Sequence, residues 1–267
     1  MKPSGSADAA ATPGDVAHER ALASGRLARF VLVRTSHPGN IGAAARAIRT
    51  MGFARLALVA PKAFPHAEAS ALAAGAGAVL DDAVVAAGLG EAIGDARLVL
   101  GATARRRDVP LEELDPRAAA QRAVRALAAG LEVAFVFGNE RVGLENDELE
   151  RCHAAITIPS DPAYPSLNLA QAVQVVAYEL RVALLAGGAA TAPAKSDPPA
   201  TSADLEVFFD HLARTLEAID FHKGRSPQTI LRRLRRLYLR AQPDQRELRI
   251  LHGILTETER AARARPA

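Results

Sequence analysis

Short apolar runs alternate with helical stretches from Leu27 to about Leu185. Five of the runs are predicted to be strands, at residues 30–33, 56–59, 98–100, 133–137 and 155–158. Helices are predicted at residues 41–51, 67–76, 116–129, 146–152 and 169–185. Because these strands are apolar throughout instead of alternating with polar residues, both faces of the sheet are expected to be covered. The pattern therefore predicts an α/β fold, with a parallel sheet and helices on both faces.

The remaining segments have a different pattern. Residues 187–203 contain small residues and prolines without periodicity, which is typical of a linker. Three further helices are predicted at residues 203–219, 227–241 and 244–262. We therefore expect four parts: a disordered N-terminal arm at 1–26, an α/β domain at 27–186, a linker at 187–203 and a small all-helical extension at 204–267.

Unusual polar sequences follow four of the predicted strands. They lie at residues 37–42, 102–105, 138–141 and 159–168. In a parallel sheet the carboxyl ends of the strands meet at one edge, and ligands bind there. The four loops are therefore predicted to form one site.

The first of these loops leads directly into a helix. A Gly39-Asn40 turn opens this helix, and Arg46 lies one helical turn after Gly42, so that it can face back over the loop. The simpler interpretation is a helix start followed by a surface arginine. A dinucleotide-binding loop is disfavoured, because the third glycine of that motif is missing.

Two more loops contain candidate polar ligands. Gly138 and Gly143 flank Glu140, which can accept hydrogen bonds from backbone amides or from Arg46; a plain turn before a helix is the alternative. Farther along, Ser166 is a candidate N-cap. Asn168 and Gln171 would then lie in the first turns of the helix, where unpaired amides can hold a small polar ligand.

Composition excludes several classes of protein. Hydrophobic residues make up 49% of the chain, as in a globular fold. The lone Cys152 rules out an intramolecular disulfide framework and is expected to be buried, and no Cys/His spacing suggests a metal site. His37 and His153 are interpreted as structural. No signal peptide or membrane span is evident, so we expect a cytoplasmic protein.

Positive charge is concentrated near the C-terminus. The formal net charge is only +3, yet residues 221–240 contain no acidic residue. A solvated helix face normally mixes both signs, so this block favours phosphate binding. The candidate RNA-binding residues are Lys223, Arg225, Arg232, Arg233, Arg235, Arg236 and Arg240.

Three segments, taken in order, resemble the motifs of the SpoU branch of the SPOUT RNA methyltransferases. They are HPGNIGAAARAIRTMGF at 37–53, FVFGNERVGLENDEL at 135–149 and IPSDPAYPSLNLAQAVQVVAYEL at 158–180. The resemblance covers roughly residues 28–185. The helical extension, at 231–255, is similar to the C-terminal region of the TrmJ group, the bacterial tRNA 2′-O-methyltransferases that act on anticodon-loop nucleotide 32.

This resemblance implies a deep trefoil knot, a homodimer and a site for S-adenosyl-L-methionine (SAM), without a metal. The residues at matching positions that would bind SAM are Ala102, Thr103, Ala104, Gly138, Ile158, Pro165, Ser166 and Leu167. The matching catalytic set is Arg46, Asn40, Glu140, Ser166 and Asn168. Pro165 stands where relatives often have serine, so only a backbone contact is expected from it.

The implied reaction is methylation of a ribose 2′-hydroxyl of tRNA at nucleotide 32. Because a guanidinium is very difficult to deprotonate, Arg46 is expected to bind phosphate and stabilise developing alkoxide charge. Two alternatives stay open: a 2′-O-methyltransferase that acts on rRNA or on another tRNA site, and a non-catalytic RNA-binding protein of the same fold. The helical extension favours tRNA.

Overall fold

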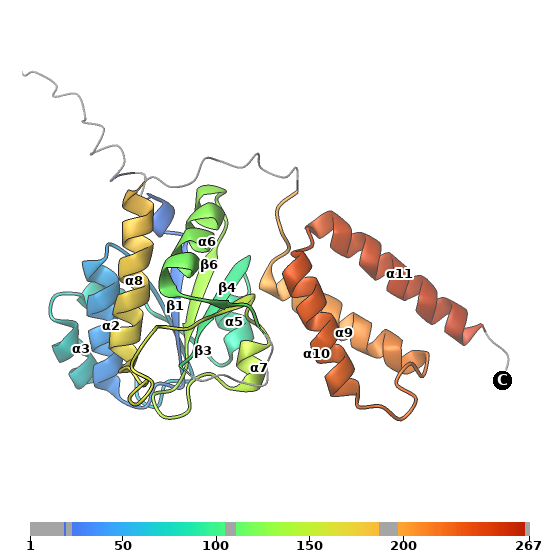
Figure 1. The fold of residues 1–267 in the computed structure, drawn as a ribbon, viewed down its shortest axis with the longest axis horizontal. Coiled ribbons are helices and arrows are strands. Elements are labelled where there is room, and N and C mark those ends of the chain that lie inside the picture. The colour runs from blue at the N-terminus through green and yellow to red at the C-terminus, as the bar shows by residue number, and fades with distance from the viewer. Residues whose placement is uncertain (1–18, 20–22, 105–110, 187–196, 265–267) are drawn as a thin grey trace, which may run out of the picture.

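The computed structural model describes residues 19, 23–104, 111–186 and 197–264 (Figure 1). Seven parallel strands form one sheet in the order β3-β2-β1-β6-β4-β7-β5. Their bounds are β1 Ala28–Val33, β2 Arg55–Val59, β3 Val84–Ala86, β4 Leu98–Ala102, β5 Glu113–Leu114, β6 Val133–Phe137 and β7 Ala154–Ile156. The predicted α/β class and its five strands are confirmed, and the short edge strands β3 and β5 are additional.

Helices cover both faces of the sheet, as predicted. One face carries α2 Pro38–Thr50, α3 Ala67–Ala73, α4 Gly77–Asp81, α6 Pro116–Ala128 and α8 Leu169–Leu185. The other carries α5 Leu89–Ile93 and the single turn α7 Asn146–Leu149. Within β1, Phe30 and Leu32 point to the first layer and Val31 to the second. This alternation explains why the central strands read as continuous apolar runs.

A separate hydrophobic core holds the C-terminal helices together. These are α9 Ser202–Ala218, α10 Pro227–Ala241 and α11 Gln245–Arg263, and α9 supplies most of the fully buried residues. Thr201, Ser226 and Asp244 cap the three helices through their side chains. The predicted all-helical extension is therefore present.

Backbone hydrogen bonds attach this extension to the α/β part. The amide of Ser202 donates to the carbonyl of Ala96 at 2.8 Å, and the amide of Ala203 donates to that of Gly94 at 3.0 Å. The boundaries at 186 and 203 stay predictions. Most of the predicted N-terminal arm and most of the predicted linker lie outside the described residues; residues 23–25 of the arm are helical. The knot also stays a prediction.

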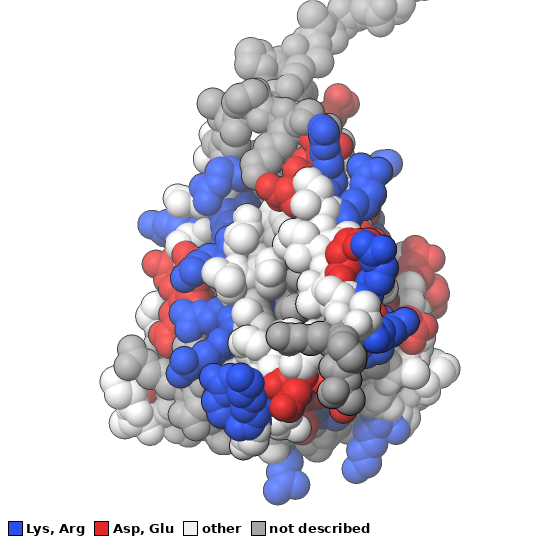
Figure 2. Space-filling view, turned by 90° about the vertical axis from the view of Figure 1, so that its right-hand side faces the viewer, with Lys and Arg blue, Asp and Glu red and all other residues white. Residues whose placement is uncertain are grey.

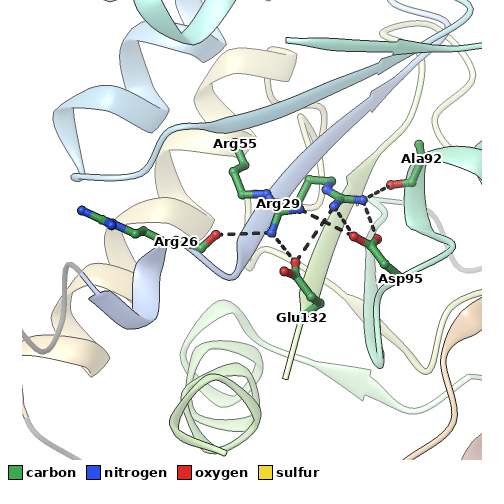
Figure 3. A network of polar contacts seen from close by, with 6 residues as sticks. All are labelled: Arg26, Arg29, Arg55, Ala92, Asp95 and Glu132. Carbon is green, nitrogen blue, oxygen red and sulfur yellow. Dashed lines mark hydrogen bonds and ion pairs between the residues drawn. The ribbon is translucent and has the colours of Figure 1, made fainter. Parts of the chain in front are cut away.

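Charged side chains connect the elements at the amino ends of the strands (Figure 3). Arg29 of β1 binds both carboxylate oxygens of Asp95, at 2.7 and 2.6 Å, and donates to the carbonyl of Ala92 at 2.6 Å. Arg55 of β2 pairs with Glu132 and lies 3.6 Å from Asp95. These pairs belong to the edge opposite the polar loops, so they stabilise the sheet without taking part in the site.

No helix in the described part of the chain is both long and apolar enough to cross a membrane.

Candidate functional site

Four neighbouring strands bring the polar loops together at one edge of the sheet. The strands β1, β6, β4 and β7 are adjacent and parallel, and their last residues are paired. Phe137 at the end of β6 pairs with Leu32 and with Ala102, and Ala102 pairs with Ile156. The loops that follow these strands therefore start at the same level, as the sequence predicted.

A cavity of about 120 Å³ lies among the loops after β4, β6 and β7. All eight residues predicted to bind SAM line it: Ala102, Thr103, Ala104, Gly138, Ile158, Pro165, Ser166 and Leu167. Glu140 also lines it, whereas Asn40, Arg46 and Asn168 are not among its lining residues. The walls combine apolar side chains with a few polar groups, which is the usual composition of a small-molecule site.

Glu140 ties the loop after β6 to the loop after β1. Its carboxylate accepts hydrogen bonds from the backbone amides of Ser36, at 2.9 Å, and of His37, at 3.2 Å. It also accepts one from the side-chain amide of Asn40 at 2.9 Å. Burial alone would raise the pKa of Glu140, but these bonds hold that pKa below its usual value. Glu140 is therefore an ionised acceptor that fixes the loops.

Asn168 adds the third polar loop to this cluster. Its side-chain amide donates to Oδ1 of Asn40 at 2.9 Å. It also caps α8, because its Oδ1 accepts a hydrogen bond from the amide of Ala170 at 2.8 Å. Gln171 completes a capping box with Asn168. The prediction that Ser166 is the N-cap is wrong, since Asn168 takes that position and leaves Ser166 on the cavity wall.

Pro165 makes an internal backbone hydrogen bond at the cavity, and its predicted backbone contact with SAM stays a prediction. Its carbonyl accepts a hydrogen bond from the Ser160 hydroxyl at 3.2 Å, and the residue lines the cavity. Ser166, Leu167 and Asn168 follow it in a loop whose residues are exposed. This wall of the cavity is therefore accessible to solvent.

Asn139 lies in one of the predicted loops, but no role was predicted for it. Its side-chain amide donates to the carbonyl of Arg34 at 2.7 Å and to the hydroxyl of Ser36 at 2.8 Å. Its Oδ1 accepts from the amide of Arg141 at 2.9 Å. An asparagine directly after a buried strand and a glycine is the signal that could have identified it.

Arg34 is a second residue that the sequence did not reveal. It directly follows β1, has a left-handed backbone (φ 51°), and pairs through its guanidinium with one carboxylate of α7 and with that of the α7 N-cap. It binds Glu148, whose side chain is only 7% exposed, and lies 3.2 Å from Glu145. Because α7 follows the loop that carries Glu140, Arg34 helps to hold that wall of the cavity in place.

Gly138 packs where no side chain fits. A Cβ atom at this position would lie 2.1 Å from the carbonyl carbon of Gly143 and from the amide nitrogen of Leu144. Gly143 itself has a positive φ of 70°. The two glycines thus let the loop fold back on itself beside the cavity.

Arg46 lies apart from this cluster. It is exposed on α2, and its guanidinium has no partner among the described residues. Of the two donors predicted for Glu140, backbone amides are the ones observed, those of Ser36 and His37, with Asn40 donating as well; Arg46 makes no such bond. The side chain therefore remains available to a ligand outside the cavity.

The remaining candidate nucleophiles and bases have structural surroundings. Cys152 is fully buried, and burial raises the pKa of its thiol to about 12. His153 accepts a hydrogen bond from the amide of Val99 at 3.0 Å, and burial lowers its pKa to about 4. The structural interpretation of these two residues is confirmed. The described residues include no group of three or more His, Cys, Asp and Glu side chains that could hold a metal ion.

The predicted RNA-binding residues differ in how far they are already bonded. Arg235 is bound by Glu206 at 2.9 Å and lies over the ring of Phe209, with 4.2 Å from its guanidinium carbon to the ring centroid. Arg225 bonds to the carbonyls of Phe221 and His222. Figure 2 shows Lys and Arg side chains gathered along the left flank of a pale band on the side of the molecule that carries the extension.

Comparisons with known proteins agree with this geometry. Residues 28–178 match the model of the SpoU rRNA Methylase family, and residues 203–267 match the C-terminal domain of tRNA methyltransferase TrmJ. A TrmJ from Pseudomonas aeruginosa, named tRNA (cytidine/uridine/adenosine-2′-O-)-methyltransferase, is 48% identical over 243 residues, which is 88% of this chain and 95% of the relative. A TrmJ from Klebsiella pneumoniae, named tRNA (cytidine/uridine-2′-O-)-methyltransferase, is 47% identical and covers 86% of this chain and 96% of its own length.

A solved structure also resembles most of the chain. The crystal structure of TrmJ from Z. mobilis superposes with a TM-score of 0.76 at 35% identity, covering 86% of this chain and 98% of that one. The chain therefore belongs to the SpoU rRNA methylase family, and its C-terminal helices are a TrmJ C-terminal domain.

Proposed function

We propose that this protein is a SAM-dependent methyltransferase of the ribose 2′-hydroxyl of nucleotide 32 in the tRNA anticodon loop. The proposal is carried by the connection between the cavity and the polar cluster. Glu140 lines the cavity and accepts a hydrogen bond from Asn40, which in turn accepts one from Asn168. The names of the TrmJ relatives support tRNA as the substrate and the 2′-oxygen as the acceptor. A tRNA substrate in turn implies a cytoplasmic enzyme.

The cavity has the chemistry that a SAM site requires. Ile158 and Leu167 supply apolar walls, while Thr103 and Ser166 supply polar groups. Gly138 also lines the cavity, where its lack of a side chain lets its backbone pack against Gly143 and Leu144. SAM, when bound, would supply a methyl group that its sulfonium already activates. These residues fit such a ligand, which combines a flat aromatic base with a polar ribose and a charged amino-acid end.

The polar cluster positions the ribose. Glu140, held ionised by its hydrogen bonds, orients Asn40, and Asn40 orients Asn168. A carboxylate with a lowered pKa is a poor base at neutral pH, so we assign Glu140 a positioning role. Ser166, Asn40 and Asn168 present polar atoms beside the cavity, where they hold the 2′-hydroxyl in line for transfer.

Arg46 acts on the RNA side of the site. Its guanidinium, which has no partner among the described residues, can bind the phosphate next to the target ribose and stabilise alkoxide charge as the 2′-oxygen loses its proton. Because Arg46 does not line the cavity of one chain, it has to be brought to the reacting oxygen by the bound RNA or by a second subunit.

A homodimer is part of the proposal. The outer face of α8 carries Tyr178, Val182 and Leu185, with exposed fractions of 52%, 43% and 44%. These residues are spaced by four and three positions, so they form one apolar stripe along the helix. Burial of this stripe against a second copy would remove it from water.

The tRNA itself is bound by the extension as well as by the α/β domain. We assign this role to Lys223 and to the exposed α10 arginines that have no acidic partner among the described residues, Arg233, Arg236 and Arg240. Such contacts position RNA through its phosphates without reading its sequence. They fit the proposed division into an α/β domain at 27–186 and a basic extension at 204–267.

The test is a nucleoside analysis of tRNA. Purified protein with SAM should introduce a 2′-O-methyl group at position 32 of unmodified tRNA, detected by mass spectrometry of nuclease fragments. The same tRNA with a 2′-deoxyribose at position 32 should accept no methyl group. Methylation of rRNA fragments instead, or methylation of the deoxy-substituted tRNA at another site, would refute the proposed target.

A further inference from the structure

A second hollow lies between the α/β part and the helical extension. It has a volume of about 690 Å³, and five arginines of α10 line it: Arg232, Arg233, Arg235, Arg236 and Arg240. Asn146 and Glu150, at the start and end of α7, line it as well. We call this hollow the α7–α10 cleft.

The five arginines of the α7–α10 cleft are not equivalent. Arg235 is satisfied by Glu206 and by the ring of Phe209, so it belongs to the structure of the extension. Arg233, Arg236 and Arg240 are exposed and find no partner in the described ranges of the chain. They lie at positions i, i+3 and i+7 and therefore share one helix face. This face presents three uncompensated positive charges.

Arg232 is the exception among the outward arginines. Its Nε lies 2.6 Å from Oε1 of Glu150, so it forms an ion pair across the cleft. The Glu150 side chain is only 19% exposed, yet this oxygen accepts no well-aligned hydrogen bond from the described residues. Glu150 is also the one carboxylate among the cleft-lining residues. The contact between Glu150 and Arg232 is therefore close but poorly aligned. An acceptor with better geometry can replace Glu150 as the partner of Arg232.

We propose that the α7–α10 cleft binds the phosphate backbone of the RNA substrate. In the absence of RNA, the carboxylate of Glu150 takes the position on Arg232 that one phosphate takes when RNA binds. Both groups are oxyanions, and a phosphate offers a guanidinium two oxygens in the bidentate geometry that Arg prefers. When the RNA backbone enters the cleft, Arg232 leaves Glu150 and binds a phosphate of the RNA. This inference rests on the proposed function, because it identifies where the same tRNA is held.

Ion pairs hold the helical extension against the α7 segment beside the cleft. Arg151, next to Glu150, pairs with Glu206 of α9 at 3.2 Å, and Glu206 in turn holds Arg235 of α10. The same α7 segment carries Glu148, which binds Arg34 beside the polar loops. These ion pairs fix the position of the cleft relative to the polar loops. An RNA backbone bound in the cleft therefore has a fixed position relative to the candidate site.

Binding of unmodified tRNA by the full-length protein tests the inference. Affinity is measured over a salt series for Glu150→Gln, Arg232→Gln and the double variant. Glu150→Gln should bind about two- to fivefold tighter, the scale of one exposed ion pair that no longer competes. The gain should vanish in the Arg232→Gln background, because Arg232 is the residue released. The triple variant of Arg233, Arg236 and Arg240 to Gln should lower the salt slope by about three.

Glu257→Gln is the matched control, since it removes the same charge from an exposed position on α11 outside the cleft. An equal gain in Glu257→Gln, or a gain in Glu150→Gln that survives without Arg232, would show general repulsion and overturn the inference. An unchanged salt slope in the triple variant would also overturn it. Methylation by the wild type is followed in parallel. Normal methylation with no effect of these variants rejects the cleft alone, whereas a wild type that neither binds nor methylates tRNA rejects the proposed function too.

Discussion

The side-chain amide of Asn168 donates a hydrogen bond to Oδ1 of Asn40 at 2.9 Å, although the two residues are 128 positions apart. The bond joins the residue before α8 to the first turn of α2. Asn168 also caps α8 through its carbonyl oxygen. One side chain thus closes the polar cluster with its donor and stabilises a helix with its acceptor, so the two roles can be separated by substitution.

Asn168→Asp should separate them. The carboxylate keeps the cap acceptor, and an acid is favourable at a helix N-terminus, so the melting temperature should stay near that of the wild type. The donor to Asn40 is lost, and methyl transfer should fall at least about tenfold, the rate equivalent of one hydrogen bond. Single-turnover rates and thermal unfolding measure the two effects.

Asn168→Ala is the comparison variant, because it removes cap and donor together. It should lose methyl transfer to the same extent and about 1 kcal/mol of stability as well. If Asn168→Asp kept the wild-type rate, the hydrogen bond to Asn40 would have no part in the reaction.

Arg46→Ala should abolish turnover without weakening SAM binding. The guanidinium lies outside the cavity, so the SAM dissociation constant from titration calorimetry should stay within about twofold of wild type. Loss of charge stabilisation at the 2′-oxygen should lower the single-turnover rate at least about 100-fold. Arg46→Lys should recover only part of it, because an ammonium lacks the planar bidentate geometry. A near-normal rate for Arg46→Ala would remove Arg46 from the catalytic set.

The central part of the fold was predictable because its strands are buried on both faces. Phe135 and Val136 face opposite layers, and both are fully buried, so the sequence shows one apolar run. The edge strands lack this signal. Val84 and Val85 of β3 are 58% and 52% exposed, and β5 has only two residues. An edge strand forms by pairing with its neighbour, which the local pattern does not encode.

The site was predictable as a set of loops but not as a network of bonds. Cavity residues such as Thr103 and Gly138 follow their strands directly, so topology alone brings them together. The pair of Arg34 and Glu148 is 114 positions apart, and it depends on the order in which the strands are placed in the sheet. The N-cap of α8 was assigned wrongly because Ser166 and Asn168 both have cap chemistry, and only the backbone decides between them.

Gly138→Ala should impair SAM binding specifically. The added methyl group would lie 2.1 Å from backbone atoms of Gly143 and Leu144, so the loop has to move away from its present position beside the cavity. Overpacking of this kind costs about 1–3 kcal/mol, and we expect SAM affinity to fall at least about tenfold. Calorimetric titration with SAM measures the change.

Gly253→Ala is the matched control for this loop substitution. Gly253 lies within α11, and a Cβ atom there would have nothing within 4 Å. Replacing a helical glycine by alanine should raise stability by about 0.5–1 kcal/mol and leave SAM affinity unchanged. If Gly138→Ala bound SAM like this control, the Gly138 loop would not shape the cofactor site.

Asp95→Asn should lower stability in a manner that depends on pH. Burial alone would raise the pKa of Asp95, but the hydrogen bonds and charge of Arg29, with the charge of Arg55, hold that pKa below the ordinary 3.8. A carboxyl whose pKa is lowered by folding stabilises the folded state fully above its unfolded pKa, and this stabilisation is lost as the pH falls through the folded value. The side chain is 52% exposed, so about 0.2–1 kcal/mol is expected near pH 7.

Urea unfolding of the wild type and Asp95→Asn between pH 7 and 3 measures this difference. The difference in unfolding free energy between the two proteins should be constant above about pH 5. It should narrow below pH 3.8, because the wild-type carboxyl then becomes neutral, as the asparagine already is. Asp82→Asn is the control, because it removes the same charge from an exposed position without a partner in the described part of the chain. A stability difference that stays constant down to pH 3 would mean that Asp95 acts through packing and not through its charge.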